Sequence, residues 1–208
     1  MSRLFPELLT VHLAADPGVA ALRARGWPAR CRVRVVLSNH FVRYALVPWS
    51  RSLSDPAEEE AYVHHHFVRI HGERAKTWAL RWSEDSADAP RLASAVDATL
   101  LDEIKASFPP GGKARLVSIQ PALMAAANHA RRALPDSGAW LVVAETDRAC
   151  VALYGHGGWR AVQNAKGPWL PTLEREWHRA PPGAPRVALL VGARPEAAAG
   201  WTFREIAA

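Results

Sequence analysis

The chain has 208 residues, of which 49% are hydrophobic and 22% charged, and its formal net charge is +6. This length suits one large domain or two small lobes, and the composition is that of a folded globular protein. No apolar run approaches the roughly 20 residues that a membrane-spanning helix needs, and residues 1–14 lack the pattern of a secretory signal. The sequence therefore predicts a cytoplasmic protein without direct membrane insertion.

The first 50 residues contain one strong strand signal. Residues 1–30 are rich in turn-forming residues, and we expect them to form an N-terminal extension packed on the main body, with a short helix within 11–25. Residues 31–37 begin with alternating polar and apolar side chains, and 41–47 are again β-rich. Because Ser38-Asn39-His40 has turn chemistry between them, the two runs predict a β-hairpin.

A helix is predicted from Asp55 to about His71. Asp55 can cap its first turn, Pro56 suits the first helical position, and Gly72 is a typical stop. The glutamates in the first turn are favoured by the helix dipole. A strand is expected at 78–82, followed by a polar loop over 83–90.

The second half alternates strand and helix signals. The expected elements are a strand at 91–96, a helix at 97–107, a strand at 114–119, a helix at 121–134, a hairpin of 140–144 with 149–154, a strand at 159–163, a helix at 169–179 and a strand at 186–191. This order predicts a layered α/β fold with a mixed sheet and flanking helices. We expect the extension to end at residue 30 and the main domain to span 31–208, with 31–90 and 91–208 as its alternative lobes.

Several of these segments resemble one family. The run from Val36 to Trp49, the acidic helix after it, the stretch from Leu116 to Ala125 and Trp140-Leu141-Val142-Val143 follow one another in the same order in the actin-like, ribonuclease H-like assembly proteins of type IV pilus and type II secretion systems. The resemblance covers roughly residues 32–165. It implies an actin-like fold and a non-catalytic scaffold that binds the cytosolic tail of an inner-membrane assembly protein, so that the chain is peripheral at the inner membrane.

The nucleotide-binding members of this family carry two phosphate loops with the pattern Asp-x-Gly. The resemblance assigns these loops to the bends Ser38–His40 and Glu145–Arg148, and neither bend contains a glycine. Glycine matters there because it lets the backbone approach a phosphate. The sequence therefore predicts a degenerate nucleotide site, no cofactor and a pseudo-ATPase. The resemblance also requires the two bends to lie on one sheet and to face a common cleft.

Histidines and cysteines are the other candidates for chemistry. His64, His65 and His66 are neighbours on a predicted helix, so their side chains diverge by about 100° from one to the next. His71 lies on the same face as His64 but about 10 Å away from it along the helix axis. We expect no metal site there. Cys31 and Cys150 lie within strand-like runs and are expected to be buried, reduced and unreactive.

Nine tryptophans are many for this length, and two of them, Trp49 and Trp169, directly follow a proline. Trp49 and Trp169 are our candidates for partner-binding residues, because tryptophan is enriched at interface hot spots, although core packing is the more common role of such a residue. A homodimer is a further possibility that the sequence leaves open.

Two other functions compete with the scaffold. A metal-dependent enzyme on a ribonuclease H-like layer would need clustered acids, for which Asp97, Glu145 and Asp147 are the candidates. A basic nucleic-acid-binding module would bind in a strongly salt-dependent manner. We expect no nucleic-acid partner, because the arginines are scattered along the chain and form no long basic run.

Overall fold

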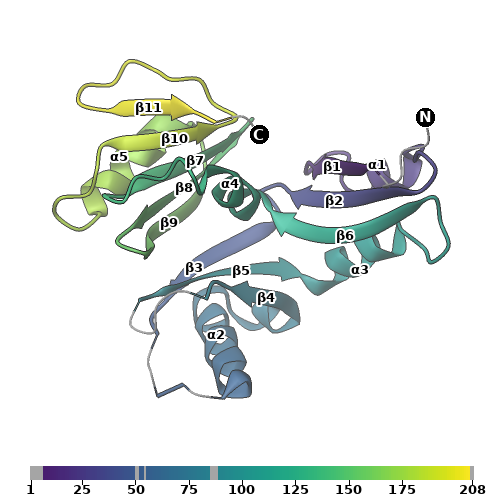
Figure 1. The fold of residues 1–208 in the computed structure, drawn as a ribbon. Coiled ribbons are helices and arrows are strands. Elements are labelled where there is room, and N and C mark those ends of the chain that lie inside the picture. The colour runs from purple at the N-terminus through teal and green to yellow at the C-terminus, as the bar shows by residue number, and fades with distance from the viewer. Residues whose placement is uncertain (1–6, 50–51, 54, 85–88, 207–208) are drawn as a thin grey trace.

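The computed structural model describes residues 7–49, 52–53, 55–84 and 89–206, and these form three sheets with helices packed against them. In Figure 1, sheet A (residues 8–13, 31–37 and 114–121) and sheet C (residues 139–145, 148–155, 158–166, 187–191 and 202–205) lie side by side, and sheet B (residues 42–47, 78–82 and 91–97) lies below both. The predicted α/β class with flanking helices is confirmed, although the strands divide among three sheets. No helix within the described residues is long and apolar enough to span a bilayer.

Sheet A is entirely parallel and has the order β1-β2-β6. Its strands are β1 (Leu8–Leu13), β2 (Cys31–Leu37) and β6 (Ala114–Pro121). Alternate residues of β2, such as Val33 and Val35, are fully buried in a core shared with α1 (Val19–Ala24) and α3 (Ala98–Ala106). The opposite face of sheet A carries mostly polar side chains, among them Arg32 and Arg34, together with Val36.

Sheet B is antiparallel and has the order β3-β5-β4. It consists of β3 (Val42–Val47), β5 (Arg91–Asp97) and β4 (Trp78–Trp82), and α2 (Pro56–His71) packs on it through Val63 and Phe67. A 3-10 helix, η1 (Glu73–Thr77), follows α2. The predicted start and stop of α2 are confirmed: Asp55 Oδ1 accepts the Ala57 N–H at 2.8 Å, and Gly72 has φ +76°.

Sheet C is mixed and has the order β11-β10-β7-β8-β9. Its strands are β11 (Thr202–Glu205), β10 (Val187–Val191), β7 (Ala139–Glu145), β8 (Arg148–Gly155) and β9 (Gly158–Lys166). One face packs against α4 (Ala122–Ala130) and the other against α5 (Trp169–Arg179). The predicted β7–β8 hairpin and the predicted bounds of α5 are confirmed.

The predicted hairpin of residues 31–47 is wrong, although both of its strands exist. β2 pairs only with β1 and β6 in sheet A, whereas β3 pairs with β5 in sheet B. The bend Ser38–His40 therefore carries the chain from one sheet to another. A turn signal marks where the chain changes direction, but the pairing partner depends on residues distant in sequence.

The sheets also cross the predicted boundaries at residues 30 and 90. β1 extends sheet A in register with β2, from Leu8 opposite Arg32 to Leu13 opposite Leu37, so residues 8–13 belong to a sheet and are not merely an extension packed on it. Sheet B joins β4 to β5 across residue 90. Whether residues 31–90 and 91–208 fold as separate lobes stays a prediction.

Candidate functional site

The two glycine-free bends meet each other. Ser38–His40 follows β2, and the turn Thr146-Asp147 joins β7 to β8. The main-chain N–H of Asn39 donates to both carboxylate oxygens of Glu145, at 3.1 Å to Oε1 and 3.2 Å to Oε2. A carboxylate from sheet C thus satisfies a main-chain donor at the end of sheet A.

His40 makes the second connection between the bends. Its Nε2 lies 2.7 Å from Asp147 Oδ1, and its Nδ1 lies 3.6 Å from Glu145 Oε2. Ser38 Oγ is 2.9 Å from the same Nδ1, which fixes the ring from the side of its own bend. Both acids of the turn are therefore engaged by the residues that face them.

An amide side chain from β9 completes this junction. Asn164 Nδ2 donates to the carbonyl oxygens of Asn39 at 2.7 Å and Val42 at 3.0 Å. Asn39 is fully buried, and its Oδ1 accepts a hydrogen bond from the Tyr44 hydroxyl at 2.9 Å. Burial raises the pKa of Tyr44 well above its ordinary value, so the hydroxyl remains a neutral donor.

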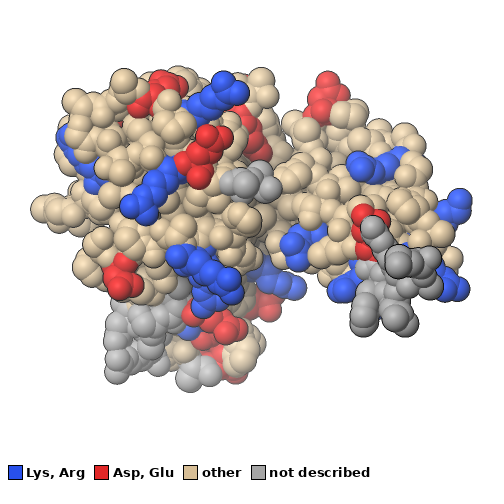
Figure 2. Space-filling model, turned by 45° about the horizontal axis from the view of Figure 1, so that its top comes forward, with Lys and Arg blue, Asp and Glu red and all other residues tan. Residues whose placement is uncertain are grey.

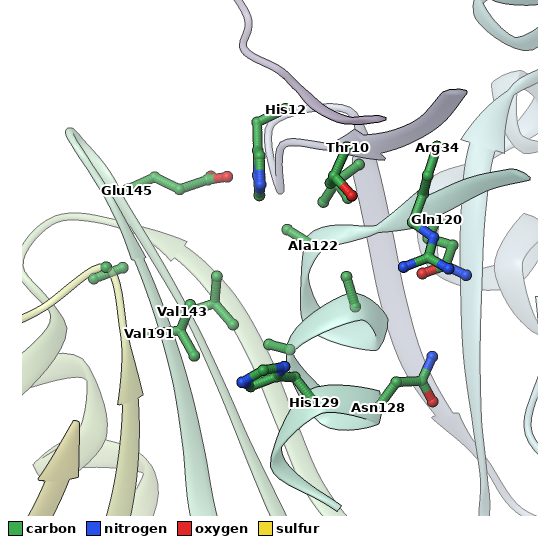
Figure 3. A pocket seen from close by; sticks show the side chains of 15 residues that line it. Thr10, His12, Arg34, Gln120, Ala122, Asn128, His129, Val143, Glu145 and Val191 are labelled. Carbon is green, nitrogen blue, oxygen red and sulfur yellow. The ribbon is translucent and has the colours of Figure 1, made fainter. Parts of the chain in front are cut away.

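A cavity of about 750 Å³ opens beside the junction. Its walls are the polar face of sheet A, helix α4 and the ends of β7 and β10, and Figure 3 shows Arg34 and Gln120 on one wall and Glu145 on the other. A smaller cavity of about 480 Å³ adjoins it, because His12, Val36, Ala122 and Glu145 line both. The second cavity is also bordered by Ala14–Asp16, the segment after β1, which sequence reasoning did not connect to the site.

The requirement that both bends lie on one sheet is wrong. Ser38–His40 lies between sheets A and B, and Glu145–Arg148 belongs to sheet C. The requirement of a common cleft is met, because the bends contact each other and both border the smaller cavity. The two bends are therefore related by direct contact across a common cleft, although they do not belong to one sheet.

The three candidate catalytic acids do not assemble. Asp97 caps α3, with its Oδ1 accepting the Thr99 N–H at 2.9 Å, while Glu145 and Asp147 are held by Asn39 and His40. Within the described residues, no group of three or more His, Cys, Asp or Glu side chains could hold a metal ion. This holds for the histidines of α2 as well. The arrangement thus offers no support to the metal-dependent enzyme.

The tryptophan candidates have different surroundings. Trp169 is 8% exposed and packs edge-on against Phe203, so it offers little surface to a partner. Trp49 is half-buried, and the Arg91 guanidinium carbon lies 3.7 Å from its ring centroid. A partner-binding role stays a prediction for both residues.

Cys31 and Cys150 are free and buried, as expected. Burial raises the pKa of the Cys150 thiol far above its ordinary value, so this thiol is protonated and a poor nucleophile.

The segment Gly155–Gly158 forms the turn between β8 and β9, with positive φ at His156 and Gly157. Although its glycines are also typical of phosphate loops, it joins two antiparallel strands and no helix follows it directly, so it is a hairpin turn.

Basic residues do not gather into one large patch on the face in Figure 2, where Lys and Arg lie among acidic and neutral residues. Ion pairs such as Arg23 with Glu103 and Arg91 with Glu59 also offset part of the positive charge. This distribution gives no specific support to the nucleic-acid-binding alternative.

Replacing Glu145 with alanine is expected to lower the free energy of unfolding by about 1–3 kcal/mol, because it leaves the Asn39 N–H without its acceptor at a half-buried junction. Urea denaturation of the variant against the parent chain measures the change. Asp147→Ala is the matched control: its side chain is 56% exposed, so its loss should cost less than about 1 kcal/mol. Equal effects of the two substitutions would contradict the assigned role of Glu145.

Comparisons with known proteins address the fold. No protein-family model and no curated protein matches the sequence. Among solved structures, the cytoplasmic domain of EpsL, an inner membrane component of the type II secretion system of Vibrio cholerae, covers 97% of this chain and 88% of its own, with a TM-score of 0.62 and 13% identity. A chain of the PilM–PilN type IV pilus biogenesis complex covers 74% of this chain and 49% of its own, with a TM-score of 0.51 and 19% identity.

A Bacteroides thetaiotaomicron protein with an actin-like ATPase fold covers 78% of this chain and 60% of its own, with a TM-score of 0.49 and 12% identity. At such low identities, the likeness to the EpsL domain and the PilM–PilN chain concerns the fold alone. That likeness agrees with the family resemblance of residues 32–165. The protein therefore shares its α/β fold with the EpsL cytoplasmic domain and with the PilM–PilN chain.

Proposed function

We propose that the protein is a non-catalytic cytoplasmic scaffold of a pilus- or secretion-type envelope assembly. It binds the cytosolic part of an inner-membrane partner and is held at the membrane by that partner. Support comes from the likeness to the EpsL cytoplasmic domain, which extends over 97% of this chain, and from the likeness to a chain of the PilM–PilN type IV pilus biogenesis complex. Self-association into a homodimer is compatible with this role.

The observation that carries the non-catalytic part of the proposal is the contact between Asn39 and Glu145. A phosphate loop binds its ligand through main-chain N–H groups, which must be free to point at the phosphate. Here the Asn39 N–H already donates to a carboxylate, and His40 lies against Asp147. A phosphate at this point would have to displace Glu145 and would meet its negative charge. We infer that the nucleotide site is lost and that the chain is a pseudo-ATPase.

The test of this proposal has two parts, and the first is thermal unfolding with and without Mg-ATP. We expect no change in Tm, whereas a ligand at 100 times its Kd would stabilise the folded state by about 2.7 kcal/mol. Glu145→Ala serves as the comparison, because it removes the carboxylate that fills the junction. A rise in Tm of the parent chain, or measurable ATP hydrolysis by it, would refute the loss of the site.

The second part asks for the partner. The tagged chain is cross-linked in its own bacterium, and proteins retained from detergent-solubilised inner membranes are identified. The cytosolic segment of each retained membrane protein is then made as a peptide and titrated into the purified chain by calorimetry. Direct binding of one such segment is expected. If no inner-membrane protein is retained, or if none of the segments binds, the scaffold proposal fails.

A further inference from the structure

The larger cavity has the dimensions of a ligand site. Its volume of about 750 Å³ lies in the range of small-molecule pockets, roughly 300–1,000 Å³. One part of its lining is aliphatic, and another part carries hydrogen-bond donors. This combination of an apolar surface and a few converging polar groups is typical of binding sites for small amphipathic molecules.

Arg34 supplies the positive charge of this cavity. It lies on the polar face of sheet A, directly opposite Ser118 of β6, and Figure 3 shows its guanidinium beside Gln120 on the cavity wall. The Nε of Arg34 and the Oγ of Ser118 are both buried without a hydrogen-bond partner in the described part of the chain. No ion pair between described residues includes Arg34.

A half-buried guanidinium without a carboxylate partner favours an anionic ligand. Burying a charge costs free energy unless an opposite charge or hydrogen bonds compensate it. Gln120 of β6 lies beside Arg34 in Figure 3, Asn128 of α4 also lines the cavity, and both amide side chains can donate further hydrogen bonds. The lining therefore offers one cation and additional hydrogen-bond donors.

The chemistry of the wall fits a carboxylate better than a polyphosphate. The planar fork of an arginine matches the two oxygens of a carboxylate, and one arginine neutralises one negative charge. Glu145 lines the same cavity and would repel a ligand of several negative charges. The nearest bend offers no free main-chain N–H at Asn39, which already donates to Glu145.

The apolar part of the cavity lining indicates that the rest of the ligand is a hydrocarbon. Val36, Val143 and Val191 are buried residues that border the cavity from three strands, and Ala126 borders it from α4. These side chains offer an apolar surface but no hydrogen bond. Placing a short hydrocarbon chain there would be favourable, because it removes apolar surface of both the ligand and the cavity from water.

We propose that this cavity binds a small aliphatic monocarboxylate, whose carboxylate pairs with Arg34 and whose hydrocarbon chain lies against Val36, Val143 and Val191. The binding site is independent of the proposed scaffold role, because it requires neither a membrane partner nor the loss of nucleotide binding. Its occupation would bring a ligand between sheet A and sheet C.

Calorimetric titration of the full chain with hexanoate tests the proposal. The neutral amide of the same chain length, hexanamide, is the matched ligand control, and inorganic phosphate is the control for a general anion site. We expect hexanoate to bind, hexanamide to bind at least about tenfold more weakly because it lacks the charge that Arg34 would pair with, and phosphate not to compete. Equal binding of hexanoate and hexanamide, competition by phosphate, or no binding of hexanoate would overturn the proposal.

The matched variants are Arg34→Gln and Arg32→Gln. Both residues lie on the polar face of β2, but Arg32 is exposed and does not line the cavity. Hexanoate affinity should fall at least about tenfold in Arg34→Gln and stay within about twofold in Arg32→Gln. Circular dichroism establishes whether each variant is folded. If Arg34→Gln does not fold, the comparison of hexanoate with hexanamide in the parent chain still tests the proposal. Retained affinity in a folded Arg34→Gln variant would exclude the assigned role of Arg34.

Discussion

Trp140→Ala is expected to lower the free energy of unfolding by about 3–5 kcal/mol, the range for removing a fully buried aromatic side chain. Trp140 lies on β7, has no exposed surface and packs with Trp169 and Leu173 of α5. Its Nε1 also donates to the Pro185 carbonyl at 3.1 Å, so the substitution removes a hydrogen bond together with the packing. Urea denaturation followed by circular dichroism measures the loss.

Trp201→Ala is the control for this prediction. Trp201 is half-buried and stacks on Phe203 with ring centroids 5.8 Å apart, so its side chain contributes packing near the surface. We expect its removal to cost about 0.5–1.5 kcal/mol. If Trp140→Ala destabilised the protein no more than Trp201→Ala, the core between sheet C and α5 would not have the importance assigned to it.

Gly192→Ala is expected to cost about 2–5 kcal/mol, the sum of a left-handed backbone and a steric clash. Gly192 follows β10 with φ +73°, a conformation that L side chains rarely adopt. A Cβ at this position would also collide with the Ala144 carbonyl oxygen of β7. The ends of β7 and β10, which form one wall of the larger cavity, would therefore have to separate. Thermal and urea denaturation both report the change.

Gly157→Ala separates these two causes. Gly157 has φ +76°, nearly the same as Gly192, but a Cβ there would meet no atom within 4 Å. Its cost should be the backbone term alone, about 1–2 kcal/mol. If the two substitutions lowered the free energy of unfolding equally, the Ala144 carbonyl would be able to move away from the added Cβ at little cost. That result would contradict the close packing of Gly192 against β7.

Local signals predicted most helices and strands. The bounds of α2 follow from Asp55, Pro56 and Gly72, and α5 likewise has the predicted bounds, Trp169–Arg179. Such signals lie within a few residues of the element that they define. They can therefore be read without knowledge of the tertiary structure.

The missed strands are β1 and β11, and each has its own reason. In β1, Thr10 and His12 alternate with buried Val11 and Leu13, so the strand pattern was present, but the turn-rich surroundings concealed it. β11 has only four residues, none of them buried, and forms the edge of sheet C. Its strand conformation depends on pairing with β10, which no local pattern indicates.

The site was predictable only in part. Both bends and the acids Glu145 and Asp147 were recognised, because turns and acidic residues are visible in the sequence. The contact of Asn39 with Glu145 joins residues 106 positions apart, and that of Asn164 with Asn39 joins residues 125 apart. Arg34 appeared as one polar residue of an alternating strand. Its unpaired state depends on which side chains the other elements bring near it.

The side-chain amide of Asn164 has a mechanical consequence. This single group, carried by β9 of sheet C, holds the carbonyls of Asn39 and Val42, at the point where the chain leaves sheet A and enters sheet B. Any hinge movement that swung sheet B away from sheet C would have to detach both carbonyls together. The start of β3 is consequently tied to sheet C by one side chain, so sheet B cannot move away from sheet C without breaking both of these hydrogen bonds.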